Sequence, residues 1–325
     1  MMIFIQILMI FISWFSCAFA DSEGQLKSVL TYHQTTDQAM FRGFEQSYTS
    51  HRRDLFYPYT GEASTALDWS IRAGARSGQF PSTKFDGYSG AIGLGRKLSE
   101  QLYVVGEIGL SQLRDVEEDQ SVEAFTYQFK VQKIWWDKIY LEVGTESGLL
   151  DHELVIPGGI ENLLDADTQT FNVTFWLHPK LRLIGRNTLR FYSDDNRRQI
   201  HDWSMMYALS LWPSWIWVGL GGEYTGFGHT TLDYWSPRKN VSYGPRLELS
   251  IPLFKSLMAT AGVNVSRIKE DDFSWGRGHY ASVGLQWKDR NDPWNLQLEY
   301  IEIESQRESS VWESESLIFS ANFAF

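Results

Sequence analysis

Charged and aromatic side chains recur along the chain at positions that alternate with apolar residues. Carboxylates and guanidinium groups bind hydroxyl groups and ions, and aromatic rings offer flat faces on which sugar rings stack. These residue types point to non-covalent recognition of a polar solute, although the same charges could simply brace a protein wall as salt bridges. The candidate residues are Glu107, Glu142, Glu146, Glu223, Glu248, Glu299, Tyr140, Trp217, Arg182, Arg186 and Arg190.

Three of these candidates, Arg182, Arg186 and Arg190, are spaced four residues apart. On a strand this spacing places all three on one face, because alternate side chains point to opposite sides. A basic stripe of this kind favours anions, as basic rings do in some pores. The alternative is that the arginines neutralise neighbouring glutamates, and the sequence leaves both interpretations open.

Covalent catalysis finds little support in the sequence. Outer-membrane phospholipases and lipid A deacylases use a His-x-Ser pair, and none of the seven histidines has Ser at the second position after it. His201-Asp202 and Asp194-Asp195 are residue types that barrel proteases use, but such pairs are common. No group of residues has metal-ligand spacing. We therefore expect no enzyme activity, no cofactor and no metal site.

The elements that position the candidates are predicted to be β-strands. The last residues, Leu317, Phe319, Ala321, Phe323 and Phe325, occupy alternate positions opposite a mostly polar set. The same alternation recurs throughout, and no segment shows a convincing helical period. About sixteen strands are expected, near residues 24–32, 38–49, 64–76, 84–96, 101–113, 122–135, 138–149, 167–178, 181–193, 198–211, 216–227, 241–253, 257–268, 276–288, 294–306 and 310–325.

The connections alternate in length. Tight turns follow the even-numbered strands, for example at Pro179-Lys180 and Lys255-Ser256, and longer polar segments such as SDDNRRQ and KEDDFSWGR follow the odd-numbered ones. This pattern is typical of outer-membrane barrels with short periplasmic turns and longer extracellular loops. It predicts an all-β fold, a transmembrane antiparallel β-barrel whose two termini lie on the periplasmic side.

The N-terminus and the composition fit export. Residues 1–20 are uncharged and mostly apolar and end in Ala18-Phe19-Ala20, so we expect a signal peptide at 1–20 and a barrel domain over 21–325. The single cysteine, Cys17, lies within that signal. The formal net charge of −11 argues against nucleic-acid binding. The 15% aromatic content suits a barrel with aromatic girdles.

A closed barrel would determine where the candidate residues point. In hydrocarbon every backbone polar group must be paired, so the sheet has to close on itself. Charges are costly against lipid, so the candidates are expected to face the lumen, and sixteen strands leave an aqueous channel there. We therefore expect a pore in the outer membrane of a Gram-negative bacterium, in contact with lipid and lipopolysaccharide.

One loop stretch is more specific. In TTLDYWSPRKNVSYGPRLELSIPL, the residues Tyr234, Trp235, Ser236 and Pro237 come shortly before the twelfth expected strand. The segment resembles the YFSP-type segment of exopolysaccharide export porins, the C-terminal barrels of the cellulose and poly-β-1,6-N-acetylglucosamine secretion proteins. The sixteen strands, the terminal Phe325 and the distance of the motif from the end are also similar.

The resemblance implies that a polysaccharide moves outward through the lumen without covalent chemistry. The acidic candidates would suit a neutral or partly cationic glycan. Proteins of that family carry a tetratricopeptide array before the barrel, and here no such array is expected between the signal and the first strand. If the role is kept, a separate periplasmic scaffold protein is expected. Phe325 is expected to engage the barrel-assembly machinery.

A substrate-specific diffusion porin is the alternative function, with an outer-membrane hydrolase as a third. Porins usually carry a long constriction loop, for which residues Leu149 to Gln169 are the candidate. Strands alone do not distinguish inward from outward transport, so both channel functions stay open at this stage.

Overall fold

The computed structural model describes residues 24–36, 39–50, 67–80, 83–99, 101–116, 120–149, 165–231, 235–288, 294–307 and 310–324. The expected signal peptide, Tyr234 and Phe325 lie outside these residues. The described residues form sixteen strands: β1 (Gln25–Thr35), β2 (Met40–Thr49), β3 (Leu67–Phe80), β4 (Thr83–Ser99), β5 (Leu102–Asp115), β6 (Ser121–Trp135), β7 (Ile139–Leu149), β8 (Asp165–His178), β9 (Leu181–Tyr192), β10 (Arg197–Ser210), β11 (Trp215–Phe227), β12 (Asn240–Pro252), β13 (Leu257–Glu270), β14 (Gly276–Lys288), β15 (Trp294–Arg307) and β16 (Ser310–Ala324).

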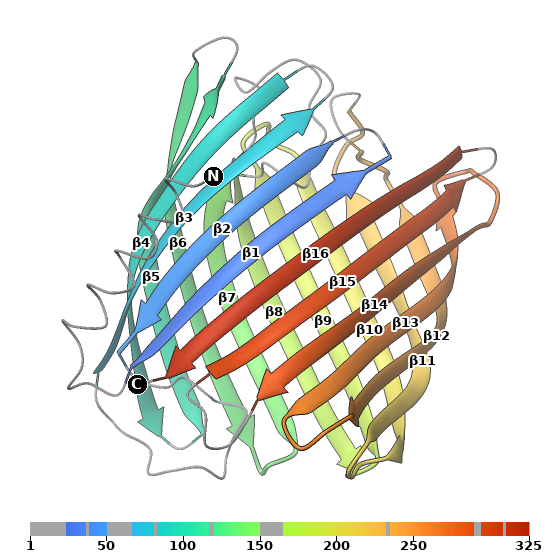
Figure 1. Cartoon of the computed structure of the whole chain (residues 1–325). Coiled ribbons are helices and arrows are strands. Elements are labelled where there is room, and N and C mark those ends of the chain that lie inside the picture. Colours follow the sequence, from blue (N-terminus) through green and yellow to red (C-terminus); the bar gives the residue numbers. More distant parts are fainter. Residues whose placement is uncertain are drawn as a thin grey trace.

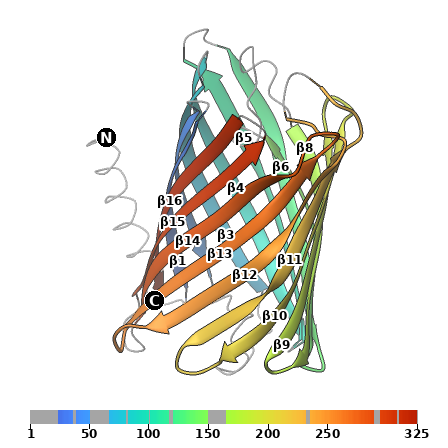
Figure 2. The ribbon, with the colours of Figure 1, turned by 90° about the vertical axis from the view of Figure 1, so that its right-hand side faces the viewer.

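The sheet is a closed barrel (Figures 1 and 2). Each strand pairs antiparallel with its sequence neighbours, and β1 pairs with β16 from Gln25↔Ala324 to Thr35↔Ser314. Closure leaves no unpaired strand edge, which is the condition for placing a sheet in hydrocarbon. The start of β1 and the end of β16 lie at one end of the barrel, together with the turns after even-numbered strands. We call this the turn end and the opposite end the loop end.

All sixteen expected strands are present, but the loops are shorter than expected. The segments SDDNRRQ and KEDDFSWGR are partly strand, because only residues 193–196 separate β9 from β10 and only residues 271–275 separate β13 from β14. The candidate constriction loop is also shorter, since β8 already begins at Asp165. Its residues 150–164 lie outside the described residues. Backbone pairing does not require apolar side chains, so charged residues extend the strands past the apolar part of the barrel.

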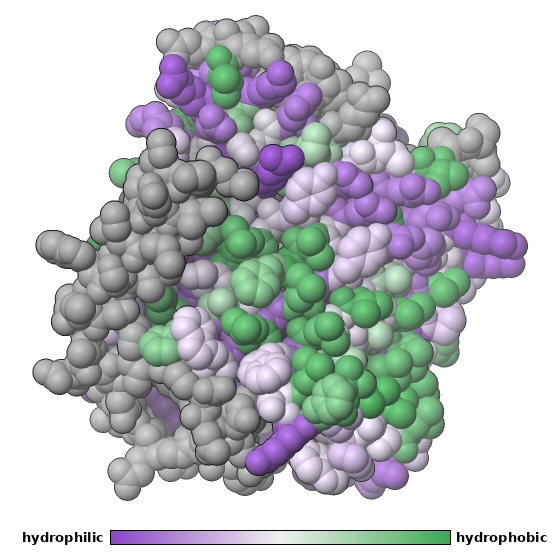
Figure 3. All heavy atoms as spheres, in the orientation of Figure 1, coloured by the Kyte–Doolittle hydropathy of each residue, from purple (hydrophilic) through white to green (hydrophobic). Residues whose placement is uncertain are grey.

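The outer face of the barrel carries an apolar belt. Exposed side chains such as Ile92, Leu110, Leu220 and Val263 point outward from the middle of their strands. Figure 3 shows this belt as a broad hydrophobic area over the C-terminal strands, with a hydrophilic patch toward the loop end. At the turn end the exposed aromatic residues include Trp136, Trp212, Phe254 and Trp294. An apolar belt with an aromatic rim is the surface that a bilayer requires.

Inside the barrel, the described residues form small apolar clusters. One contains Ala39, Phe85, Leu113 and Leu149, and another contains Met206, Ala208 and Trp217. No helix in the described ranges is long and apolar enough to cross a membrane.

Candidate functional site

The predicted site residues lie on the face of the sheet opposite the apolar belt. Glu107, for example, is followed on β5 by the outward-facing Ile108. Arg182 of β9 contacts Glu248 of β12 across two intervening strands, which is within reach on the concave side of the wall. By the same alternation, the structure places on the lumen wall Glu107, Glu142, Glu146, Glu223, Glu248, Glu299, Tyr140, Trp217, Arg182, Arg186 and Arg190.

The strand register joins several of these residues into one row. Residues that pair across antiparallel strands on one face have Cβ atoms about 5 Å apart. From β6 to β11, the register pairs each of the following residues with the next: Gln132, Glu142, Asn172, Arg186, Asp202 and Glu223. We call this set the polar row. It brings three separate predictions, Glu142, Arg186 and Glu223, into one continuous strip of the wall.

Glu142 is firmly held within the polar row. Its carboxylate accepts hydrogen bonds from Gln132 Nε2 at 2.6 Å, from the Tyr140 hydroxyl at 2.8 Å and from Asn172 Nδ2 at 3.1 Å. Lys130 Nζ lies 3.8 Å from the same carboxylate. Tyr140 and Glu142, which were predicted independently, therefore act as one fixed unit of the wall.

Asp202 links two arginines because a glycine leaves room for one of them. Arg246 of β12 crosses β11 and donates to Asp202 Oδ1 of β10 at 2.7 Å. The Arg246 guanidinium lies directly over Gly221, where any Cβ atom would meet it. Arg186 Nη1 lies 3.8 Å from the other oxygen of Asp202. The carboxylate of Asp202 is thus shared between two guanidinium groups.

The three arginines predicted as a stripe have separate partners. Arg182 contacts Glu248, and its guanidinium carbon lies 4.2 Å from the centroid of the Trp217 ring. Arg190 donates from Nε to Thr168 Oγ1 at 3.1 Å. The structure thus favours neutralisation of the wall over a free basic stripe. Basic side chains also lie beside several of the predicted glutamates.

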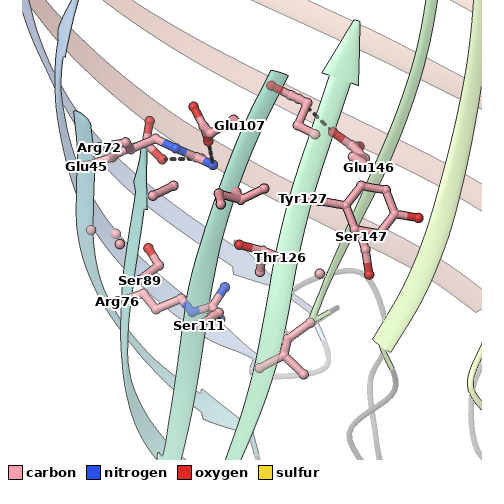
Figure 4. A pocket seen from close by; sticks show the side chains of 18 of the residues that line it. Glu45, Arg72, Arg76, Ser89, Glu107, Ser111, Thr126, Tyr127, Glu146 and Ser147 are labelled. Carbon is pink, nitrogen blue, oxygen red and sulfur yellow. Dashed lines mark hydrogen bonds and ion pairs between the residues drawn. The ribbon is translucent and has the colours of Figure 1, made fainter. Parts of the chain in front are cut away.

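A cavity of about 450 Å³ opens on the lumen side of β2 to β9 (Figure 4). In it, Arg72 Nη1 lies 3.1 Å from Glu45 Oε2, while Arg72 Nη2 donates to Glu107 Oε1. Arg72 belongs to β3 and Glu107 to β5, so this contact also crosses an intervening strand. Glu107 is therefore one member of a carboxylate–guanidinium–carboxylate group that faces the cavity.

Two further polar contacts line the same cavity. Arg76 Nη2 donates to Ser111 Oγ at 2.7 Å, and the Arg76 side chain passes Gly87 of β4 on the way. Gln128 Nε2 donates to Glu146 Oε2 at 3.0 Å, which places the predicted Glu146 in this cavity (Figure 4). The cavity therefore joins residues from β3, β5, β6 and β7.

Two predicted carboxylates have few protein contacts. Glu223 accepts a hydrogen bond from Thr225 Oγ1 at 3.0 Å. The side chain of Glu299 makes no hydrogen bond or ion pair with any described residue. Both carboxylates keep acceptor capacity that is directed into the lumen.

Trp235 of the predicted loop motif packs against the wall at the loop end. Its Nε1 donates to Glu270 Oε2 at 3.0 Å, and its ring meets Phe227 edge-on at a centroid distance of 6.1 Å. The Arg198 guanidinium carbon lies 5.7 Å from the centroid of the same indole. The indole thus joins the loop to β10, β11 and β13.

The rest of the motif shapes the loop itself. Ser236 Oγ accepts from the backbone N–H of Thr231 at 2.7 Å and donates to the Thr231 carbonyl at 3.2 Å. The carbonyl of Pro237 accepts the backbone N–H of Phe227 at 3.0 Å, so the loop rejoins the ladder there. Tyr234 lies outside the described residues. These contacts give the motif a structural role.

Sequence reasoning missed Glu45, Arg76 and Asp202 as site residues. Alternation alone places each of them on the polar face of its strand. Their partners lie on other strands, however, and the contacts become visible only when the register is known. Within the described ranges, no cluster of three or more His, Cys, Asp or Glu residues could hold a metal ion.

Comparison with known proteins shows a likeness of fold. No family model matches the chain, and no curated protein matches it. Among solved structures, the chain is similar to a bacterial polysaccharide outer membrane secretin, with a TM-score of 0.74 and 12% identity over 94% of this chain and 99% of that one. It is also similar to CdiB from Acinetobacter baumannii, with a TM-score of 0.52 and 8% identity over 93% of this chain and 60% of that one. The chain thus has the closed antiparallel barrel fold of outer-membrane proteins.

Proposed function

We propose that this chain forms an outer-membrane channel through which an exopolysaccharide passes in an aqueous lumen, without covalent chemistry. The observation that carries the proposal is the combination of an apolar outer belt with a continuous polar row on the inner wall, from Gln132 to Glu223. A barrel of sixteen strands is wide enough to leave an aqueous channel. The fold similarity to a polysaccharide secretin supports a polymer as the cargo.

The paired charges of the wall favour a glycan with many hydroxyl groups and little net charge. Asp202 lies between Arg186 and Arg246, and Glu248 lies beside Arg182. Such pairs present both donors and acceptors but create only a weak net field. A hydroxyl group can donate and accept, so it can bind to either member of a pair.

A diffusion channel for a small polar solute is the second candidate. The observation that favours it is the cavity beside β2 to β9, whose volume of about 450 Å³ is that of a small-molecule site. In this case the same wall would select single small solutes, and it would not conduct a polysaccharide.

The placement of His201 and Asp202 supports transport rather than hydrolysis. His201 Nδ1 lies 2.6 Å from Asn187 Oδ1, and the His201 ring stacks on Tyr224 at the outer face. Asp202, in contrast, contacts Arg246 in the lumen. Adjacent strand residues point to opposite faces, so these two side chains do not form a catalytic pair.

Conductance of the refolded protein in planar bilayers tests the proposal. We expect stable channel steps, and we expect added neutral oligosaccharides to interrupt the current for longer as their length increases. Interruptions that do not depend on oligosaccharide length would favour the diffusion channel. Absence of any current from protein that runs as a folded, heat-modifiable barrel would contradict both channel functions.

A further inference from the structure

Small residues open the cavity beside β2 to β9. Gly43, Ala91 and Gly148 all line it. A Cβ atom at Gly43 would have Thr31 Cβ as its nearest neighbour, at 3.9 Å, so the space in front of this glycine is open. On the β9 to β12 part of the wall, by contrast, Arg182 and Trp217 stack on each other and occupy the lumen side. The cavity beside β2 to β9 therefore offers room for a ligand that this part of the wall does not.

The charged groups of the cavity keep unused hydrogen-bonding capacity. The side chains of Arg72 and Glu45 are 38% and 43% exposed although they bind each other. A guanidinium group has five N–H donors and a carboxylate can accept about four hydrogen bonds. The pair therefore still offers donors and acceptors, side by side, to a ligand in the cavity.

Hydroxyl groups add to this set from other strands. Ser89 of β4 and Thr126 of β6 line the cavity (Figure 4). Neither hydroxyl has a hydrogen-bond partner among the described residues. Beside Thr126 on the same wall, the Gln128–Glu146 pair of β6 and β7 presents a second donor and acceptor together. A ligand in the cavity would thus be met by polar groups from several neighbouring strands.

We propose that this cavity binds one uncharged, polyhydroxylated ring of the cargo, recognised through the hydroxyl groups on its edge. The inference rests on the proposed channel function and names the recognition unit within it. The charged groups point to an uncharged ligand, because Arg72 is already bracketed by Glu45 and Glu107. A volume of about 450 Å³ lies within the range of small-ligand sites. The alternation of donors and acceptors matches vicinal hydroxyl groups, each of which can donate and accept.

The residence time of a neutral glucose oligomer in the channel tests this site. Gly43→Val fills the open space in front of the glycine, where a Cβ atom meets nothing closer than 3.9 Å. Gly106→Val is the matched control, because Gly106 lies on the outer face and its Cβ would be 3.8 Å from the nearest atom. We expect Gly43→Val to shorten the blocking events about tenfold, the effect of losing roughly one good contact, and Gly106→Val to leave them unchanged.

The outcomes separate the site from the channel. Equal residence times in wild type and Gly43→Val would overturn the site but leave the channel proposal standing. If Gly43→Val does not fold, Glu45→Gln preserves the volume and is expected to shorten the blocks. A preference for amino-sugar or uronate oligomers over the neutral oligomer would overturn the assignment to an uncharged ring.

A folded wild-type protein that conducts no current would contradict the channel alone. In that case, calorimetric titration of the detergent-solubilised protein with the same oligomer tests the site directly. Binding that Gly43→Val abolishes would support the site, and absence of binding to the wild-type protein would overturn it.

Discussion

At the scale of single residues, small side chains decide which charges meet on the lumen wall. Arg246 reaches Asp202 because Gly221 on the strand between them has no side chain. Arg76 passes Gly87 in the same way to reach Ser111. We call these glycines crossing points. At each of them, an arginine side chain from one strand passes over the neighbouring strand to reach its partner.

The substitution Gly221→Ala tests such a crossing point. A Cβ atom at this position meets the Arg246 guanidinium, so the arginine must move away from Asp202. We expect the free energy of unfolding to fall by about 1.5 to 3 kcal/mol, the usual contribution of a hydrogen bond between charged groups. Urea unfolding in lipid vesicles, followed by tryptophan fluorescence, measures it. The control is Gly106→Ala on the outer face, and equal stability of the two variants would refute the crossing-point role.

The charge balance of the wall is tested at Asp202. This carboxylate offsets the positive charge of both Arg186 and Arg246. The substitution Asp202→Asn therefore leaves two guanidinium groups in the lumen with less compensating negative charge. We expect the reversal potential under a KCl gradient to shift toward anion selectivity. Asp167→Asn, whose carboxylate accepts the Tyr127 hydroxyl on the outer face, is expected to cause no shift. A shift of the same size in both variants would show that ion selectivity does not depend on whether the removed carboxylate faces the lumen.

At the scale of elements, the connection between β11 and β12 is fastened to its neighbours. The side chain of Asn196, only 1% exposed, donates to the His229 carbonyl at 3.0 Å and accepts the His229 N–H at 3.2 Å. The Asp271 carboxylate accepts the backbone N–H of Lys239 at 2.7 Å. The loop is therefore tied to the turn on either side of it.

Removal of the Asn196 side chain should release this loop. Asn196→Ala breaks both contacts with His229. We expect hydrogen exchange in residues 228–231 and 235–239 to accelerate by about tenfold or more, since each lost buried hydrogen bond costs roughly 1 to 3 kcal/mol. Asn187→Ala on the outer face provides the comparison. Unchanged exchange in the Asn196 variant would mean that the loop is held by other contacts.

The strands were predictable from the sequence, whereas their ends and mutual contacts were not. Alternation identified strands as different as β5 and β16, because one face of each must be apolar. The end of β13, expected at residue 268, was missed because Lys269 and Glu270 continue pairing with β12 beyond the belt. The contact between Arg246 and Asp202 depends on the tilt and register of three strands, which no local pattern encodes. Single-sequence reasoning therefore found the polar face but not its pairings.

At the scale of the whole molecule, the barrel separates two environments with one sheet. Ser282 and Val283 are neighbours on β14, yet Val283 belongs to the exposed outer belt and Ser282 faces Gly262 and Ile301 on the inner side. This separation requires closure, because an open sheet would leave unpaired backbone groups in hydrocarbon. Both the proposed channel and the proposed ligand site depend on water being present on one face only.

Thiol labelling in a bilayer measures that separation most directly. The single cysteine of the sequence lies in the expected signal peptide, so Ser282→Cys and Val283→Cys would each carry one thiol after cleavage. With a charged maleimide and protein in lipid vesicles, we predict rapid labelling of the cysteine at position 282 and none at position 283. Labelling of position 283 but not of position 282, or equal labelling of both, would contradict a water-filled barrel with an outer face in lipid.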